Sequence, residues 1–206
     1  LGTLGNKDIN KLSFPKISEI EIIGLSDKDN LKLMEDFKFL VIENLFFLDK
    51  KKIENIINRN KLVEKYLIFK KYPSSLKIKI FKTEFLAYVK RDGVDFLLGS
   101  NGKYIRTNDK EKKIPFVYGN FNKNDFKNLK DLIDNSNFNF KEIKNLYFFP
   151  SGRWDIETYS GILIKLPKEE LKKNIDLFTI MLTDQKFEKV NLIDLRQKNQ
   201  IITNDQ

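Results

Sequence analysis

The stretch KYPSSLKIKIFK, residues 71–82, combines a turn with a strand whose two faces differ in polarity. The segment Tyr72-Pro73-Ser74-Ser75 has the proline and serine content of a tight turn. After it, Leu76, Ile78 and Ile80 alternate with lysines. This period of two is typical of an antiparallel strand that is buried on one face and hydrated on the other. We therefore predict a turn that leads into a half-buried strand with its lysine face toward water.

The residues before this stretch complete a small α+β unit. Residues 17–23, closed by Gly24, have the composition of a strand, and a short helix is expected around residues 31–37. Asp49 is placed to cap a helix over residues 50–59, whose apolar positions Ile53, Ile56 and Ile57 recur at helical spacing. With an apolar strand at residues 66–69, the predicted order over residues 17–85 is strand, helix, helix, strand, strand.

The rest of the chain has the texture of a hairpin-rich domain. Asp92-Gly93 and Asn101-Gly102 each separate two apolar segments, and both dipeptides are typical of tight hairpins that need positive φ values. Helices are predicted around residues 126–133 and 171–182. Strands are predicted at residues 143–149, 154–158, 162–166 and 190–195, the last being followed by a polar tail.

The composition argues against most catalytic chemistries. The chain has 206 residues, 41% of them hydrophobic and 33% charged, as in a globular protein, and no apolar run is long enough for a membrane span. It contains no cysteine and no histidine, which excludes thiolate chemistry and removes the commonest general base and metal ligands. We predict no cofactor and no metal.

The net charge of +9 comes mainly from lysine, since only 5 of the 38 basic residues are arginine. Nucleic-acid recognition favours arginine, so a hydrated lysine surface is the preferred interpretation.

Two features could carry function but have simpler structural explanations. Asp155 and Glu157 share a face of a predicted strand, as paired catalytic carboxylates would, but alternating charge is also typical of an exposed strand face. Trp154 is the only tryptophan, and we interpret it as a core aromatic residue rather than a ligand platform. No glycine-rich phosphate loop is present.

The order of these segments resembles the FtsQ/DivIB family of bacterial cell-division proteins. The resemblance covers roughly residues 15–203 and rests on short motifs that occur in the same order as in the family. These motifs are LFFLD at 45–49, KYPSSLKI at 71–78, NG at 101–102, IPFVYG at 114–119, RWDI at 153–156, GILIKL at 161–166 and IDLR at 193–196. Phe85-Leu86-Ala87 departs from the family's usual proline-containing step, and Gln197 stands where the family has an aromatic residue.

The resemblance implies an α+β fold. Its first part would be a POTRA-like strand-helix-helix-strand-strand domain at residues 16–88. A mostly antiparallel β domain with flanking helices would follow at residues 89–206, ending in an edge strand and a polar tail. Residues 1–15 would be a linker after a missing membrane anchor, since the sequence begins at Leu1 rather than Met.

By the same resemblance, the protein would be a non-enzymatic scaffold of the divisome. It would cross the inner membrane once, lie on the extracytoplasmic side at the septum, recruit FtsB-like and FtsL-like partners, and help to control septal wall synthesis. No nucleic acid and no small-molecule substrate are expected.

The end of the sequence suggests where a partner could dock. If the strand at residues 190–195 is the last one, it lies at a sheet edge, and a partner segment could add to it as a new strand. Arg196 would pair with a partner carboxylate, and an isoleucine of the tail would supply apolar contact. The candidate partner-binding residues are Asp194, Leu195, Arg196, Gln197, Asn199, Ile201 and Ile202.

The sequence is also compatible with other interpretations. A second candidate surface is the basic face of the POTRA-like part, which would suit anionic lipid headgroups or an acidic partner; its lysines are Lys70, Lys71, Lys77, Lys79 and Lys82. The protein could instead be a POTRA-bearing chaperone or transport component of the envelope. A basic nucleic-acid-binding protein is the alternative from a different class.

Overall fold

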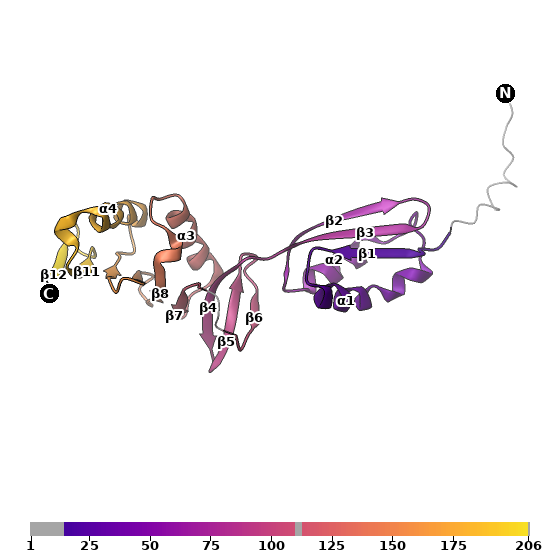
Figure 1. The fold of residues 1–206 in the computed structure, drawn as a ribbon, viewed down its shortest axis with the longest axis horizontal. Helices are drawn as coiled ribbons and strands as arrows, with labels where there is room; N and C mark the ends of the chain where they lie inside the picture. The colour runs from indigo at the N-terminus through magenta and orange to yellow at the C-terminus, as the bar shows by residue number, and fades with distance from the viewer. Residues whose placement is uncertain (1–14, 110–112, 206) are drawn as a thin grey trace, which may run out of the picture. The chain divides into compact units, whose positions relative to one another are not determined.

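The computed structural model describes residues 15–109 and 113–205. The predicted linker at residues 1–15 therefore lies almost wholly outside the described residues. The chain divides into two compact units between Glu84 and Phe85 (Figure 1). The predicted domain boundary after residue 88 falls inside a strand of the second unit, because that strand begins at Phe85. Among the described residues, no helix is long and apolar enough to cross a membrane.

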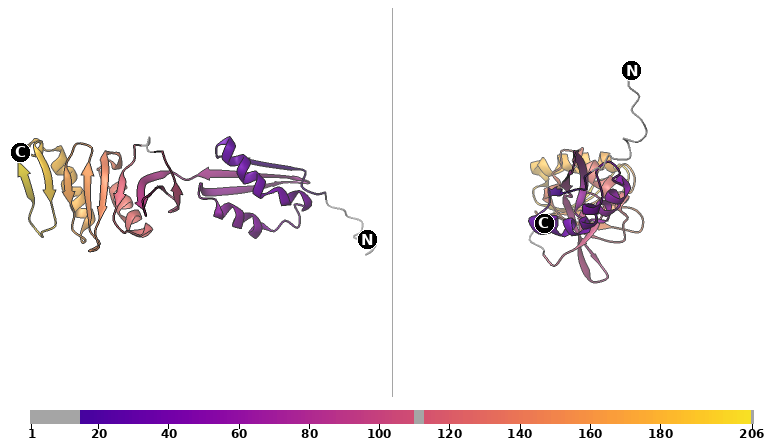
Figure 2. Two further views of the ribbon diagram at one scale, coloured as in Figure 1. Left: turned by 90° about the horizontal axis from the view of Figure 1, so that it is seen from below. Right: turned by 90° about the vertical axis from the view of Figure 1, so that its right-hand side faces the viewer.

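The first unit is a three-stranded sheet with two helices on one face (Figures 1 and 2). The sheet order is β1-β3-β2, with β1 parallel and β2 antiparallel to the central β3. Its elements follow the predicted order, and they are β1 (Glu19–Ile23), α1 (Asp27–Asp36), α2 (Lys50–Arg59), β2 (Val63–Lys71) and β3 (Ser75–Lys82), with a 3-10 turn at Lys38–Ile42.

Helix α2 of the first unit has a capped N-terminus and an apolar face that enters the core. The Asp49 carboxylate accepts a hydrogen bond of 2.9 Å from the Lys51 N–H, so α2 has the predicted cap and the predicted bounds. Its apolar stripe enters the core, where Ile53 and Ile57 are fully buried. In β3, Leu76, Ile78 and Ile80 point into the same core, while the lysines between them face away. The prediction made from residues 71–82 is confirmed.

The second unit is built on a nine-stranded mixed sheet. The strand order is β12-β11-β10-β9-β8-β7-β4-β5-β6, and antiparallel neighbours outnumber the parallel pairs β4–β7, β7–β8 and β10–β11. The predicted α+β fold class is confirmed. The strands are β4 (Phe85–Arg91), β5 (Val94–Gly99), β6 (Tyr104–Arg106), β7 (Phe116–Tyr118), β8 (Ile143–Phe148), β9 (Trp154–Thr158), β10 (Leu163–Lys165), β11 (Val190–Asp194) and β12 (Ile202–Asp205). The helices are α3 (Lys123–Asp134) and α4 (Leu171–Thr183).

Both helices lie on one face of this sheet (Figures 1 and 2). Five side chains in register across neighbouring strands, each at most 2% exposed, form the sheet's contribution to the core beneath them: Val117, Leu146, Ile156, Ile164 and Ile193. Trp154 is 2% exposed, with its ring centre 4.8 Å from that of Phe148 and 5.9 Å from that of Phe121. The prediction of a core tryptophan is confirmed.

One of the two predicted hairpins has a different turn. Asp92 and Gly93 adopt positive φ values of 49° and 77°, as a two-residue turn between β4 and β5 requires. Between β5 and β6, only Gly102 has a positive φ, 71°. There the Gly99 N–H donates to the Lys103 carbonyl at 3.0 Å, which encloses a three-residue loop. The prediction that Asn101 also takes a positive φ is wrong, because the longer loop needs only one left-handed residue.

The prediction that no strand follows residues 190–195 is also wrong. The chain turns back at Asn199, whose φ of 61° lies in the left-handed region that asparagine tolerates better than most residues. It then forms β12, which pairs antiparallel with β11. The edge of the sheet is therefore β12, and β11 is an interior strand.

Candidate partner-binding site

β12 forms one end of the nine-stranded sheet. It comes last in the strand order, so within residues 15–109 and 113–205 its outer edge pairs with no strand. In an antiparallel strand, the backbone groups of alternate residues point to opposite sides. Half of the N–H and C=O groups of β12 therefore face outward, where another strand could bind them. Ile201 and Ile202 beside this edge are 46% and 43% exposed.

Arg196 is held by Asp194 of the same chain. The Arg196 Nε donates to both Asp194 carboxylate oxygens at 2.8 and 3.0 Å, and Nη2 donates to Oδ2 at 2.5 Å. These side-chain bonds hold the pKa of Asp194 below its usual range and raise the pKa of Arg196. The Arg196 side chain remains 39% exposed. The guanidinium thus has an internal partner and a solvent-facing side, whereas the sequence pointed only to a carboxylate of another protein.

A row of charged residues extends from this pair into the sheet. Lys165 of β10 stands in register with Asp155 of β9 on one side and with Asp194 of β11 on the other. Asp155 is 4% exposed, and its Oδ1 lies 3.6 Å from the Arg153 Nε. Burial raises the pKa of Asp155, and the nearby cations Arg153, Arg196 and Lys165 partly oppose that rise. Arg196 therefore lies at the end of a row of residues of opposite charge.

The neighbouring carboxylate, Glu157, ties two strands together. It accepts hydrogen bonds from Asn145 Nδ2 at 2.8 Å, Lys144 Nζ at 2.9 Å and Tyr147 OH at 2.7 Å. These donors lower its pKa from 4.5 to about 2, and burial with the bond to Glu157 raises the pKa of Tyr147 to about 12. The expected exposed charged face is wrong for Asp155, which is buried. Both carboxylates are engaged in contacts within the sheet.

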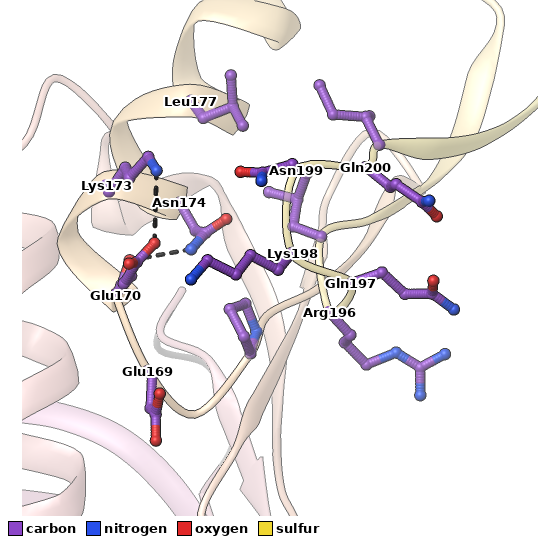
Figure 3. Close-up of a pocket in the computed structure, with 13 residues that line it drawn as sticks. Glu169, Glu170, Lys173, Asn174, Leu177, Arg196, Gln197, Lys198, Asn199 and Gln200 are labelled. Carbon is purple, nitrogen blue, oxygen red and sulfur yellow. Dashed lines mark hydrogen bonds and ion pairs between the residues drawn. The ribbon is translucent and has the colours of Figure 1, made fainter.

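A cavity of about 380 Å³ lies at the loop that leads into β12 (Figure 3). It is formed between the start of α4 and the loop of residues 195–201. Lys173 and Glu170 form an ion pair of 3.4 Å on its α4 side. In Figure 3, Lys198 extends across the cavity toward α4, while Arg196 and Gln197 point away from it. Leu177 and Ile201 contribute apolar surface. The cavity could accept a side chain of a segment bound along β12.

The structure brings the predicted site residues together but gives them different roles. Asp194 and Leu195 are buried, at 6% and 3% exposure, so their side chains support the loop rather than form its surface. The exposed members are Arg196, Gln197, Asn199, Ile201 and Ile202. Sequence reasoning missed Thr203, Asn204 and the α4 side of the cavity. The sequence signal for β12 was the β-branched run Ile201-Ile202-Thr203, which follows Asn199, a residue type that tolerates the left-handed conformation of a turn.

Comparison with known families agrees with this architecture. The profile described as "Cell division protein FtsQ/DivIB, C-terminal" matches residues 87–196. The chain belongs to the FtsQ/DivIB family of cell division proteins. A second profile, "POTRA domain, FtsQ-type", matches residues 16–82, which contain the first unit's sheet and helices.

A solved structure of a DivIB protein is also similar to this chain. It is the major extracytoplasmic domain of the trans isomer of the bacterial cell division protein DivIB from Geobacillus stearothermophilus. The sequence identity is 11%, the match covers 52% of this chain and 97% of that one, and the TM-score is 0.37. A search of curated proteins found no match.

In this FtsQ/DivIB protein, the C-terminal profile match ends at Arg196. The loop and β12 follow directly after it, and they contain most of the exposed candidate residues. Within the part of the chain that the structure describes, no group of three acidic side chains is arranged to hold a metal ion. The strongest chemical feature of the site is thus an open backbone edge next to a fixed charge pair and a cavity.

Proposed function

We propose that this protein is a non-enzymatic scaffold of the divisome that recruits FtsB-like and FtsL-like partners by strand addition at β12. The observation that supports this proposal best is the position of β12 at the end of the sheet order, where its outer edge pairs with no other described strand. Membership of a cell-division family supplies the process in which the scaffold acts. Through its partners the protein would help to control septal wall synthesis.

Strand addition divides affinity and selectivity between backbone and side chains. Hydrogen bonds along the β12 edge bind any extended segment, so they give affinity without selection. Selection comes from the surroundings of the edge. The cavity takes one side chain of the partner, exposed Ile202 offers apolar contact, and the outer side of Arg196 attracts a carboxylate.

The Asp194–Arg196 pair would pre-organise this selection. Because Asp194 fixes the guanidinium through Nε and Nη2, little side-chain entropy is lost when a partner carboxylate reaches its exposed side. We propose that the first unit lies nearest the membrane and that the second unit, which begins at Phe85, binds the partners. A single membrane-spanning segment would hold both on the extracytoplasmic side of the inner membrane, at the septum.

Two proline substitutions test the proposal. Of the neighbouring residues Thr203 and Asn204, one directs its N–H toward β11 and the other directs it outward. Proline removes the donor in either case. We expect one variant to keep the thermal midpoint of the second unit, and this should be the variant whose replaced residue directs its N–H outward. That variant should abolish binding of the purified FtsB-like partner from the same bacterium.

The control is the exposed helix position Lys127, far from β12 in sequence and on α3. Lys127→Ala should leave partner binding unchanged. If both proline variants fold and bind the partner with unchanged affinity in calorimetry, the β12 edge is not the docking site.

A further inference from the structure

The sheet of the first unit has an uncovered face with an unusual composition. Helices α1 and α2 cover one side, where Tyr66 and Ile68 of β2 and the isoleucines of β3 pack. Strand alternation sends the intervening residues to the opposite side. There, Lys65 stands opposite Phe81, Leu67 opposite Lys79 and Phe69 opposite Lys77 across the β2–β3 pair.

Each of these three cross-strand pairs therefore places a lysine beside a large apolar side chain. Leu67, Phe69 and Phe81 are 48%, 44% and 42% exposed. The Lys79 Nζ lies 5.2 Å from the centre of the Phe81 ring. We define the outer-face patch as Lys65, Leu67, Phe69, Lys71, Lys79 and Phe81.

The acidic residues of this face lie at its other edge and are already engaged. Glu21 of β1 pairs with Lys77 at 2.9 Å, and Glu19 accepts a hydrogen bond from the Ser75 hydroxyl at 2.9 Å. By contrast, Lys65, Lys71 and Lys79 form no ion pair with the residues that the structure describes. The patch on the β2 side is thus a positively charged surface that also exposes three large apolar groups.

We propose that the outer-face patch binds the surface of a membrane that contains anionic phospholipid. Peripheral proteins bind such surfaces by combining buried apolar area with lysine–headgroup attraction, and the patch offers both on one face of the sheet. Lysine stems lie along apolar surface while their ammonium groups reach the phosphates, which matches the position of Lys79 beside Leu67 and Phe81. The inference is independent of the β12 site, which lies in the other unit.

Vesicle co-sedimentation of the 206-residue chain tests the proposal. The chain should bind vesicles of phosphatidylglycerol mixed with phosphatidylcholine, and it should bind pure phosphatidylcholine vesicles far more weakly. A lysine near an anionic surface is worth roughly fivefold in affinity. The Lys65→Glu/Lys79→Glu variant should therefore bind the anionic vesicles at least about 25-fold more weakly.

A charge-matched control separates the patch from the net charge. The Lys141→Glu/Lys186→Glu variant changes two exposed lysines of the second unit and should retain most of the binding. Phe69→Ser/Phe81→Ser should also weaken binding, since it removes the apolar part while keeping all lysines. Circular dichroism of each variant checks that it is folded.

Three results would overturn the proposal. Equal binding to neutral and anionic vesicles would remove the role of charge. Equal losses in the two lysine variants would assign the binding to net charge rather than to the patch. Retention by an immobilised polyglutamate peptide, without retention by anionic vesicles, would assign the patch to an acidic protein segment instead.

Discussion

Replacing Glu157 with glutamine should make the second unit less sensitive to acid. Glu157 is a carboxylate that accepts three hydrogen bonds, from Asn145, Lys144 and Tyr147. Those donors favour the ionised form in the folded protein and lower its pKa from 4.5 to about 2. Since the folded-state pKa is depressed, the stabilisation is present above pH 4.5 and is lost as the pH falls toward 2.

The size of the effect follows from the shift. A difference of about 2.5 pKa units corresponds to about 3.4 kcal/mol between the fully ionised and fully protonated limits, and about 2 kcal/mol of it is lost between pH 7 and pH 3. Water reaches 22% of the Glu157 side chain. Solvent screening lowers the expected loss to about 1–2 kcal/mol.

The assay is urea unfolding at pH 7 and pH 3, followed by tryptophan fluorescence. Trp154 is the only tryptophan and is buried in the second unit, so its emission reports on that unit alone. Between pH 7 and pH 3, the wild-type chain should lose about 1–2 kcal/mol more than Glu157→Gln does. Glu188→Gln is the control, because the exposed Glu188 carboxylate forms no ion pair with the described residues. Identical pH dependence of the wild type and Glu157→Gln would refute the reasoning.

Further substitutions probe the second unit with the same fluorescence assay. Gly119→Ala should destabilise it by about 3 kcal/mol or more, because a Cβ there would lie 2.1 Å from the Phe148 carbonyl oxygen. The control Gly161→Ala places its Cβ more than 4 Å from any atom outside the two adjacent residues and should cost only about 1 kcal/mol of backbone strain. Similar losses in the two variants would contradict the steric argument. Asn122→Ala removes one half of the α3 capping box and should cost about 1 kcal/mol, so an unchanged urea midpoint would argue against the cap. Ile156→Ala should cost about 2–5 kcal/mol, since the side chain is fully buried between sheet and helices; a smaller loss would mean that the core closes around the cavity.

Sequence patterns predicted correctly those features that depend only on residues close together in the chain. The alternation in β3 and the cap of α2 at Asp49 both depend on residues close together in sequence, and both are confirmed. The Asp92-Gly93 hairpin is confirmed for the same reason, because the turn itself requires two left-handed residues.

The features that the sequence did not reveal depend on distant pairing. β7 has three residues and becomes a strand only because β4 and β8 provide partners on either side. β12 depends in the same way on β11. The burial of Asp155 also follows from the sheet, since β8 and β10 lie on either side of its strand, β9. Period-two alternation alone cannot distinguish such a face from a hydrated one.

The sequence therefore indicated where in the chain the candidate site lies, but not which strand forms its edge. The sequence located the C-terminal edge and Arg196, but it assigned the edge to β11 and left the guanidinium without an internal partner. The reversal at Asn199 moves the free edge to β12 and creates the cavity against α4.

The most direct test of strand addition is amide hydrogen exchange of the second unit, measured by NMR residue by residue with and without the FtsB-like partner. The outward-facing amides of β12, within Ile202–Asp205, should exchange rapidly in the free protein and become strongly protected in the complex. The amides of β6, at the opposite end of the sheet, should not change. Protection that appears elsewhere in the unit, with β12 exchanging as fast as before, would contradict the account.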